Sequence, residues 1–150
     1  MKNCRDILIA DDDSDDASFL AEAIQHILPS AKCVHVRDGI AALRHIKTNA
    51  KPDLVFLDLN MPLKNGIDCL KDISNLELLP DTPIVIYSTS QNIKDIDQAY
   101  KYNASFYIIK PSSFTELCKV ISTAIVFLGK PRGERVEKAN FVLKEGKVVV

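Results

Sequence analysis

Apolar residues along this chain gather in five short runs, and polar residues follow the end of each run. The runs are rich in β-branched and aromatic residues and are too short to form helices, so they predict buried strands. These predicted strands cover residues 6–10, 32–36, 53–57, 83–87 and 105–109.

Between the runs, apolar residues recur at steps of three and four, which is the spacing of an amphipathic helix. The first such pattern spans residues 19–28 and ends at Pro29. The strongest pattern begins after a cap at Ser112 or Ser113 and ends at Gly129. Weaker patterns follow the second, third and fourth runs, at residues 40–46, 67–73 and 93–100.

Strands that alternate with helices predict an α/β fold, because the connection between two parallel strands usually contains a helix. We expect a doubly wound parallel sheet with helices on both faces. Residues 1–128 would form this domain. Residues 129–150 lie outside the repeating pattern, and they are expected to form either a flexible tail or a short hairpin that turns at Glu145–Gly146.

The composition of the chain excludes several classes of function. Its 150 residues are 47% apolar, which is enough for one core, and 19 basic residues nearly balance 20 acidic ones. A chain so close to neutral lacks the basic surface expected of a nucleic-acid binder or of a coat on anionic membranes. No apolar run is long enough for a signal peptide or a membrane span. Because no C-x-x-C pair is present either, we expect a cytoplasmic protein with free cysteines at Cys4, Cys33, Cys69 and Cys118.

Chemically distinctive residues follow four of the predicted strands. Acids at 11–13 follow the first strand, Asp58 follows the third, hydroxyl residues at 88–90 follow the fourth, and Lys110 follows the fifth. Carboxyl ends of parallel strands meet at one edge of a sheet, where ligands bind in such folds. Crowded carboxylates there need a cation, and a site made of oxygen ligands suits Mg²⁺.

The same residues have the chemistry needed to accept a phosphoryl group. The carboxylate of Asp58 can act as a nucleophile and form an acyl phosphate. Lys110 supplies a positive charge for the phosphoryl oxygens, and Ser88 supplies a hydroxyl donor. The chain also has Pro62 and Gly66 in the segment after the third predicted strand, and Tyr107 and Pro111 close to Lys110.

Taken together, this set resembles the receiver domains of two-component response regulators over about residues 6–128. The resemblance implies a five-stranded flavodoxin-like sheet in the order 2-1-3-4-5. It also implies that Asp58 is the phosphorylated residue and that Mg²⁺ binds through the carboxylates of Asp12 and Asp58. Asn60 would add its backbone carbonyl, and Asp11 would act mainly through water.

The resemblance further implies how the protein signals. Ser88 and Tyr107 would form the switch, and a histidine kinase would be the phosphoryl donor. Several stretches are similar to single-domain regulators that partner bacterial phytochrome-type kinases, which favours a stand-alone regulator that signals by changing its partners. Asp15 and Asp16 are interpreted only as favourable charges and caps at the start of the first helix.

Three other functions are compatible with the same fold. An aspartyl-phosphate phosphatase normally has a second aspartate two residues after the nucleophile, and Asn60 stands there, so we expect a phosphoryl acceptor rather than a phosphatase. A pseudo-receiver would work without phosphorylation. The presence of the complete set of acids, together with Ser88 and Lys110, argues against this function. A flavin carrier would have to bind the phosphate of its flavin beside acidic side chains that repel it. The absorbance of the purified protein would reveal a bound flavin.

Two further expectations concern the phosphorylated state. Neither Asn60 nor Ser90, the two residues that flank the approach of water in receivers, is a carboxylate, so the acyl phosphate should hydrolyse slowly. In the order 2-1-3-4-5 the fifth strand, with Phe106 and Tyr107, would be an exposed sheet edge. That edge predicts a homodimer that responds to phosphorylation.

Overall fold

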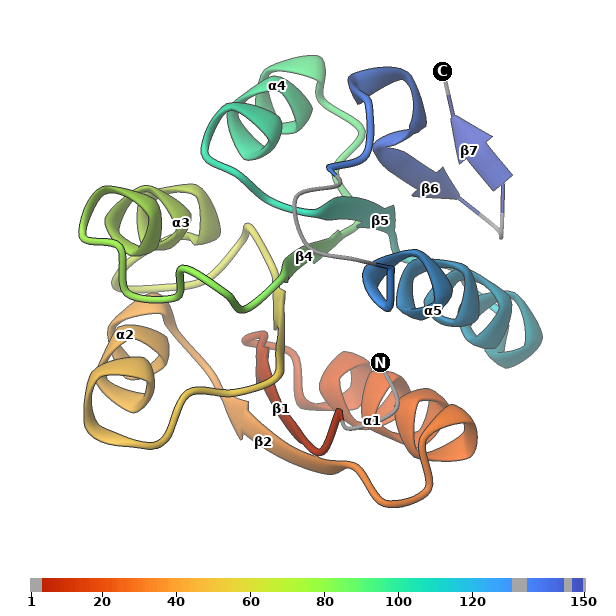
Figure 1. Cartoon of the computed structure of the whole chain (residues 1–150), viewed down its shortest axis with the longest axis horizontal. Coiled ribbons are helices and arrows are strands. Elements are labelled where there is room, and N and C mark those ends of the chain that lie inside the picture. Colours follow the sequence, from red (N-terminus) through yellow and green to blue (C-terminus); the bar gives the residue numbers. More distant parts are fainter. Residues whose placement is uncertain (1–3, 131–134, 145–146, 150) are drawn as a thin grey trace.

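The computed structural model describes residues 4–130, 135–144 and 147–149 of the chain. Within these residues, the five predicted strands and the five predicted helices all form, and they alternate as expected (Figure 1). In chain order they are β1 Asp6–Ala10, α1 Ser14–Ile27, β2 Lys32–Val36, α2 Gly39–Thr48, β3 Leu54–Leu57, α3 Gly66–Asn75, β4 Ile84–Ser88, α4 Ile93–Lys101, β5 Phe106–Ile109 and α5 Phe114–Leu128.

Each of these helices begins at a polar residue whose side chain accepts a hydrogen bond from a backbone N–H two or three positions later. Such caps satisfy donors that have no partner inside the helix, and they fix where the helix starts. Ser113 is therefore the cap of α5, as predicted. The other four caps are Asp13, Asp38, Asn65 and Asn92.

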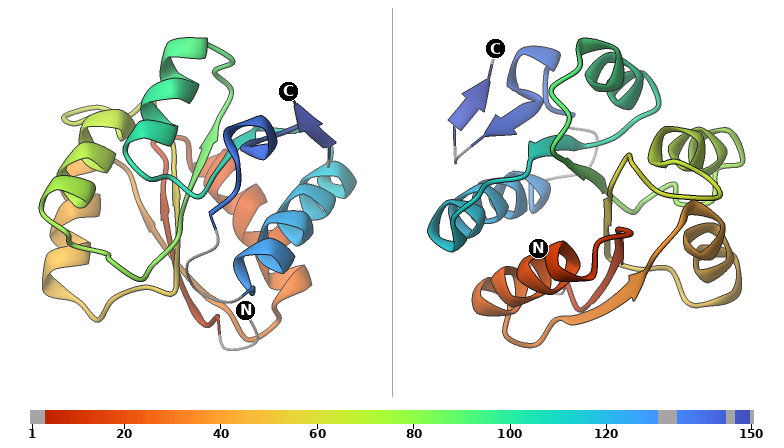
Figure 2. Two further views of the ribbon diagram at one scale, coloured as in Figure 1. Left: turned by 45° about the horizontal axis from the view of Figure 1, so that its top comes forward. Right: turned by 180° about the vertical axis from the view of Figure 1, so that it is seen from behind.

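The strands form one sheet in the order β2-β1-β3-β4-β5-β6-β7, and all pairs from β2 to β6 are parallel. Helices α1 and α5 pack together on one face of the sheet, while α2, α3 and α4 cover the other (Figures 1 and 2). The predicted α/β class and the flavodoxin-like order 2-1-3-4-5 are thus confirmed. The central strands β1, β3, β4 and β5 carry the fully buried core, which explains why they read as continuous apolar runs.

Two additional strands lie beyond β5, namely β6 Val142–Lys144 and β7 Lys147–Val149, which follow a short 3₁₀ turn at Lys138–Asn140. Strand β6 pairs with β5 in parallel, and β7 pairs with β6 in the antiparallel sense. The chain end thus forms a hairpin that extends the sheet; its predicted turn, Glu145–Gly146, lies outside the described residues.

The expectation of an exposed β5 edge is therefore wrong. Tyr107 pairs with Val142 across the β5–β6 ladder, and the side chains of Phe106 and Tyr107 are buried. The physical reason is that an open edge leaves backbone groups unpaired, and β6 supplies their partners. Phe141 and Leu143 are buried as well, so the pairing also removes apolar side chains from water.

Phe141 joins the hairpin to the face between α4 and β5. Its ring lies 5.0 Å from that of Tyr100 and 6.3 Å from that of Tyr107, measured between centroids. The hydroxyl of Tyr100 donates to the carbonyl of Val136, which attaches the segment before the hairpin to α4. Phe106 and Tyr107, which were expected at an exposed edge, are thus covered by the chain itself.

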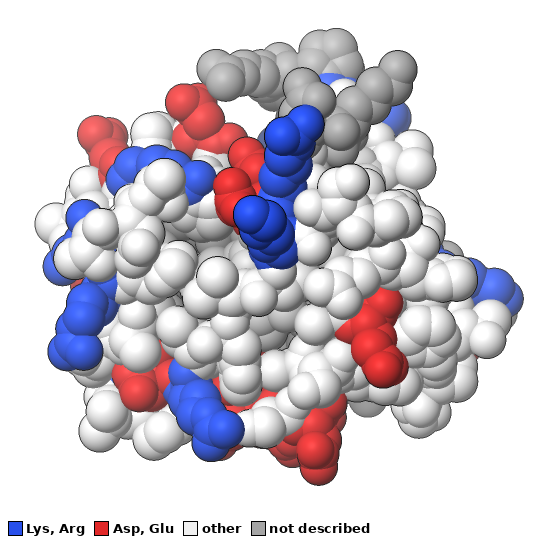
Figure 3. Space-filling view, turned by 90° about the horizontal axis from the view of Figure 1, so that it is seen from below, with Lys and Arg blue, Asp and Glu red and all other residues white. Residues whose placement is uncertain are grey.

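The surface agrees with the near-neutral composition. The face that lies lowest in Figure 1, over β2, has an uncharged centre with acidic and basic side chains spread around its margin (Figure 3). Within the described part of the chain, no helix combines the length and the hydropathy that a bilayer span requires.

Candidate functional site

The carboxyl ends of β1 and β3 bring three aspartates together. Asp11 and Asp12 follow β1, Asp58 follows β3, and one oxygen from each lies within 4.8 Å of the others. Asp11 and Asp58 are buried, with 1% and 5% of their surface exposed, whereas Asp12 is open to solvent. Three carboxylate oxygens at this spacing, with one side open, form a donor set that fits a hard divalent cation such as Mg²⁺ or Mn²⁺.

Lys110, at the end of β5, places its ammonium among these acids. Its Nζ lies 2.9 Å from Asp11 Oδ2, 2.9 Å from Asp16 Oδ2 and 3.2 Å from Asp58 Oδ2. Only 8% of the lysine side chain is exposed, and the ammonium also lies 5.2 Å from the centroid of the Tyr87 ring. One buried cation therefore holds three carboxylates together.

The pKa values of these groups reflect their burial and their mutual attraction. Burial raises the pKa of the Asp11 carboxyl, although the hydrogen bond from Lys110 acts in the opposite direction. Burial also acts to lower the pKa of Lys110, but the bonds to Asp11 and Asp16 outweigh it, so the net shift is upward. Lys110 is therefore charged throughout the physiological range, and the site still carries more negative than positive charge.

Backbone contacts fix the position of Asp58. Its N–H donates to the carbonyl of Ala10 at 2.9 Å, and its Oδ1 accepts from the N–H of Leu59 at 2.7 Å. Gly66 packs directly against this peptide: a Cβ there would lie 2.1 Å from the carbonyl oxygen of Asp58. The glycine that the resemblance singled out is thus required by this close approach, which holds the loop after β3 beside the acids.

The expected switch residues lie on the other side of the site. Ser88 ends β4, is fully buried, and its Oγ accepts from the N–H of Ser90 at 3.2 Å. The hydroxyl of Tyr107 donates to the carbonyl of Ser90 at 2.8 Å. Tyr107 is therefore buried and bonded to the loop between β4 and α4.

The sequence interpretation missed one member of the site. Asp16 was read as a charge at the start of the first helix, yet its side chain bonds Lys110. The capping residue is Asp13, whose Oδ1 accepts from the N–H groups of Asp15 and Asp16. The position of Asp16 in the chain is the sequence feature that could have indicated this role. Helix α1 starts shortly after β1 ends, so side chains of its first turn lie near the strand ends.

Asn60, which was expected to contribute its backbone carbonyl, is exposed at the start of the loop after β3.

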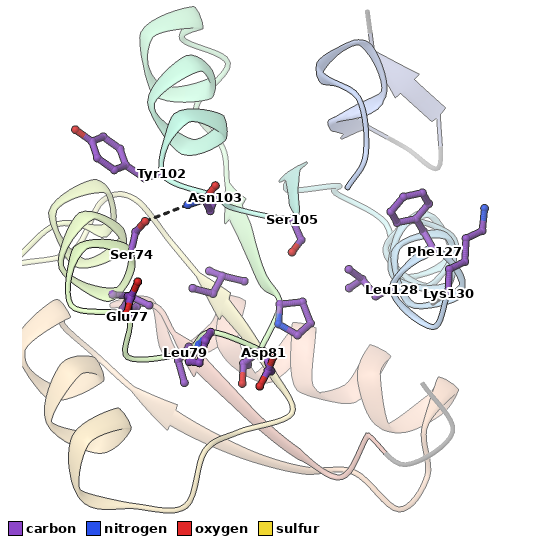
Figure 4. A pocket seen from close by; sticks show the side chains of 15 residues that line it. Ser74, Glu77, Leu79, Asp81, Tyr102, Asn103, Ser105, Phe127, Leu128 and Lys130 are labelled. Carbon is purple, nitrogen blue, oxygen red and sulfur yellow. Dashed lines mark hydrogen bonds between the residues drawn. The ribbon is translucent and has the colours of Figure 1, made fainter. Parts of the chain in front are cut away.

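A separate groove of about 640 Å³ lies at the opposite end of the sheet (Figure 4). It is lined by residues near the starts of β4 and β5 and near the ends of α3 and α5. Asn103, which adopts a left-handed φ of 70°, donates there to the hydroxyl of Ser74 at 3.1 Å. None of the predicted site residues lines this groove.

Comparisons with known proteins agree with this geometry. Response regulator Rcp1 of Synechocystis sp. is 27% identical over 121 residues, which are 77% of this chain and 82% of Rcp1. The crystal structure of the phosphorylated cyanobacterial phytochrome response regulator RcpA superimposes with a TM-score of 0.75 at 29% identity, covering 83% of this chain and 93% of that one. For the Mn²⁺-bound form of Rcp1 the TM-score is 0.72 at 26% identity, with 82% and 93% covered. Residues 7–122 match the family model of the response regulator receiver domain, and the chain therefore belongs to this family.

Proposed function

We propose that this protein is a stand-alone response regulator that accepts a phosphoryl group from a histidine kinase on Asp58 and signals by changing the partners it binds. The observation that carries the proposal is the position of the buried Asp58, which has a carboxylate oxygen within 4.8 Å of oxygens of Asp11 and Asp12 and lies 3.2 Å from Lys110 Nζ. As a receiver domain, the chain is a phosphoryl acceptor in a two-component system rather than a phosphatase. The relatives described above are matched over most of their length, which supports a regulator built from this domain.

In the proposed transfer, a carboxylate oxygen of Asp58 attacks the phosphorus of a phosphohistidine. The O–P bond forms as the P–N bond breaks, and the kinase imidazole leaves with the electron pair. Asp11, Asp12, Asp58 and the backbone carbonyl of Asn60 would hold Mg²⁺, whose charge would offset that of the acids and the phosphoryl oxygens. The similarity to a Mn²⁺-bound form of Rcp1 supports a divalent cation as the cofactor.

Lys110 and Ser88 would then hold the new phosphoryl group. The Lys110 ammonium lies 3.2 Å from Asp58 Oδ2, so it needs little movement to bond a phosphoryl oxygen. The Ser88 hydroxyl would donate to another oxygen. A Ser88 side chain that turns toward the phosphoryl group would alter the bond that its Oγ accepts from the N–H of Ser90, and Tyr107 is bonded to the carbonyl of the same residue. The β4–α4 loop thus connects the site to the α4–β5 face.

The partners follow from the family and from the fold. A histidine kinase supplies the phosphoryl group in a two-component system, and the similarity to phytochrome response regulators favours a phytochrome-type kinase in the cytoplasm. We retain residues 1–128 as the receiver and 129–150 as an appended hairpin. A phosphorylation-sensitive homodimer stays a prediction, but it would have to use a surface other than a bare β5 edge, because β6 occupies that edge.

Phosphotransfer from kinases tests the proposal. Phosphorylated histidine kinases of several classes, phytochrome-type included, are mixed with the protein and Mg²⁺, and the loss of label from each kinase is followed. We expect rapid transfer from a phytochrome-type kinase to the wild type and none to Asp58→Asn. Asp15→Asn, which removes an acid that is not bonded to Lys110, is the control. Transfer to Asp58→Asn at the wild-type rate would refute the assignment of Asp58.

A further inference from the structure

We propose that Asp16 is a positioning residue that holds the Lys110 ammonium in place when a divalent cation takes over the other carboxylates of the site. The inference rests on the proposed function, because it assigns the lysine a task at the phosphoryl site. Its basis is the pair of distances from Lys110 Nζ, which are 2.9 Å both to Asp16 and to Asp11.

The hydrogen bonds of the ammonium show why a third carboxylate matters. An ammonium has three N–H donors, and that of Lys110 has three carboxylate partners: Asp11, Asp16 and Asp58. Asp11 and Asp58 also belong to the group of residues whose carboxylate oxygens can hold a metal, whereas Asp16 does not. A bound cation therefore competes with the lysine for two of its three partners and leaves the third unaffected.

The placement of Asp16 suits this task. Its backbone N–H donates to Asp13 Oδ1 at 3.1 Å, so the capped first turn of α1 fixes the backbone position from which the Asp16 side chain extends. Its side chain is 42% exposed, while that of Asp11 is 1% exposed, so Asp16 carries its charge in contact with water and needs no metal to neutralise it. Asp16 thus keeps the ammonium beside Asp58 while the buried acids turn to the metal.

Two consequences distinguish this role from a general effect of negative charge. With Asp16 removed, the ammonium depends on Asp11 and Asp58 alone and competes more strongly with the metal. Mg²⁺ affinity should then fall by more than the loss of one nearby charge explains. The effect should also require Lys110, because Asp16 acts through that residue and not on the metal itself.

Isothermal titration of the full-length protein with Mg²⁺ tests these consequences. We expect Asp16→Asn to weaken Mg²⁺ binding by about three- to tenfold, and the matched charge control Asp15→Asn by less than about twofold. Asp16→Glu, which keeps the charge, should recover part of the affinity. In a Lys110→Met background, Asp16→Asn and Asp15→Asn should have the same small effect.

The outcomes separate this inference from the proposed function. Equal effects of Asp16→Asn and Asp15→Asn in the wild-type background would overturn the inference, and so would a full Asp16→Asn effect that persists without Lys110. Should Lys110→Met fail to fold, the comparison of Asp16→Asn, Asp16→Glu and Asp15→Asn decides alone. Labelling of Asp58 is measured separately, so its absence would refute the phosphoryl acceptor and leave the metal measurements valid.

Discussion

At the scale of single residues, the Lys110 ammonium stabilises the buried carboxylates of the site when no metal is bound. Lys110→Met would leave the buried carboxylates of Asp11 and Asp58 without their cation. Removing one partner of a buried ion pair is strongly destabilising, so we expect the free energy of unfolding in EDTA to fall by about 3 kcal/mol. Mg²⁺ should restore much of this loss, because it supplies the missing positive charge.

Urea unfolding with EDTA and with Mg²⁺ measures both effects. Lys119→Met is the matched control, because the side chain of Lys119 is 62% exposed and its single described ion pair, with Glu116, lies at the surface. If Lys110→Met were as stable as Lys119→Met in EDTA, Lys110 would not be holding the acids together.

We also expect the lifetime of the phosphorylated state to depend on single side chains. Ser90 is expected beside the path of the attacking water, and it cannot act as a base. A carboxylate there could orient and activate the water, so Ser90→Glu should speed the decay of phospho-Asp58 by about tenfold or more. The release of inorganic phosphate measures the decay.

Ser90→Ala is the control, because Ser90 Oγ donates to Asp95 at 2.7 Å and both substitutions remove that bond. The same decay rate in Ser90→Glu and Ser90→Ala would place residue 90 away from the path of the water.

The residues that the sequence predicted share a simple signal. Asp11, Asp58, Ser88 and Lys110 each lie at the end of an apolar run, and parallel pairing alone brings such ends together. Asp16 has no such signal, because an acid in a first helical turn is already explained by the helix dipole. Only the folded structure, in which the Lys110 ammonium lies 2.9 Å from Asp16 Oδ2, shows that this carboxylate reaches the lysine.

At the scale of elements, the loop after β3 is held in place by Gly66. Gly66→Ala would place a Cβ 2.1 Å from the carbonyl oxygen of Asp58, so the loop or the strand end must shift. Small displacements at a reacting centre reduce rates strongly, and we expect labelling of Asp58 to slow by about 100-fold. Intact mass during reaction with acetyl phosphate and Mg²⁺ measures the rate.

Gly129→Ala is the control for an added methyl group, because Gly129 is exposed and adopts a right-handed φ of −78°. A Gly66→Ala variant that labels as fast as Gly129→Ala would show that this close approach does not position the site.

The C-terminal hairpin is the element that the sequence described least well. Strands β6 and β7 have three residues each, which is too short for a periodic pattern to be recognised. The strand that β6 pairs with, β5, is separated from it in the sequence by all of α5. The alternatives of a tail and a hairpin therefore stayed open. What decides between them is tertiary: β5 offers an unpaired edge, and Phe141 finds Tyr100 and Tyr107 to pack against.

At the scale of the whole molecule, the hairpin governs whether the β5 edge can associate. Leu143→Asp would place a charge at a position that is 1% exposed, and it should detach β6 from β5. We expect the exposed edge to pair between copies and to raise the mass measured by light scattering.

Hydrogen exchange verifies that the hairpin has detached, since the N–H of Tyr107 is bonded to the carbonyl of Phe141 at 3.1 Å and should exchange faster. Val126→Asp on α5, where the side chain is 70% exposed, is the control for an added charge. Fast exchange at Tyr107 together with an unchanged monomer mass would show that the edge is not adhesive.

We propose above all that Asp58 accepts a phosphoryl group in a site completed by a divalent cation. The most direct measurement is the intact mass of the protein after reaction with acetyl phosphate, with and without Mg²⁺, followed by peptide mapping. We expect one added phosphoryl group on Asp58 with Mg²⁺, almost none in EDTA, and none in Asp58→Asn. Undiminished labelling of Asp58→Asn, or equal labelling in EDTA, would contradict it.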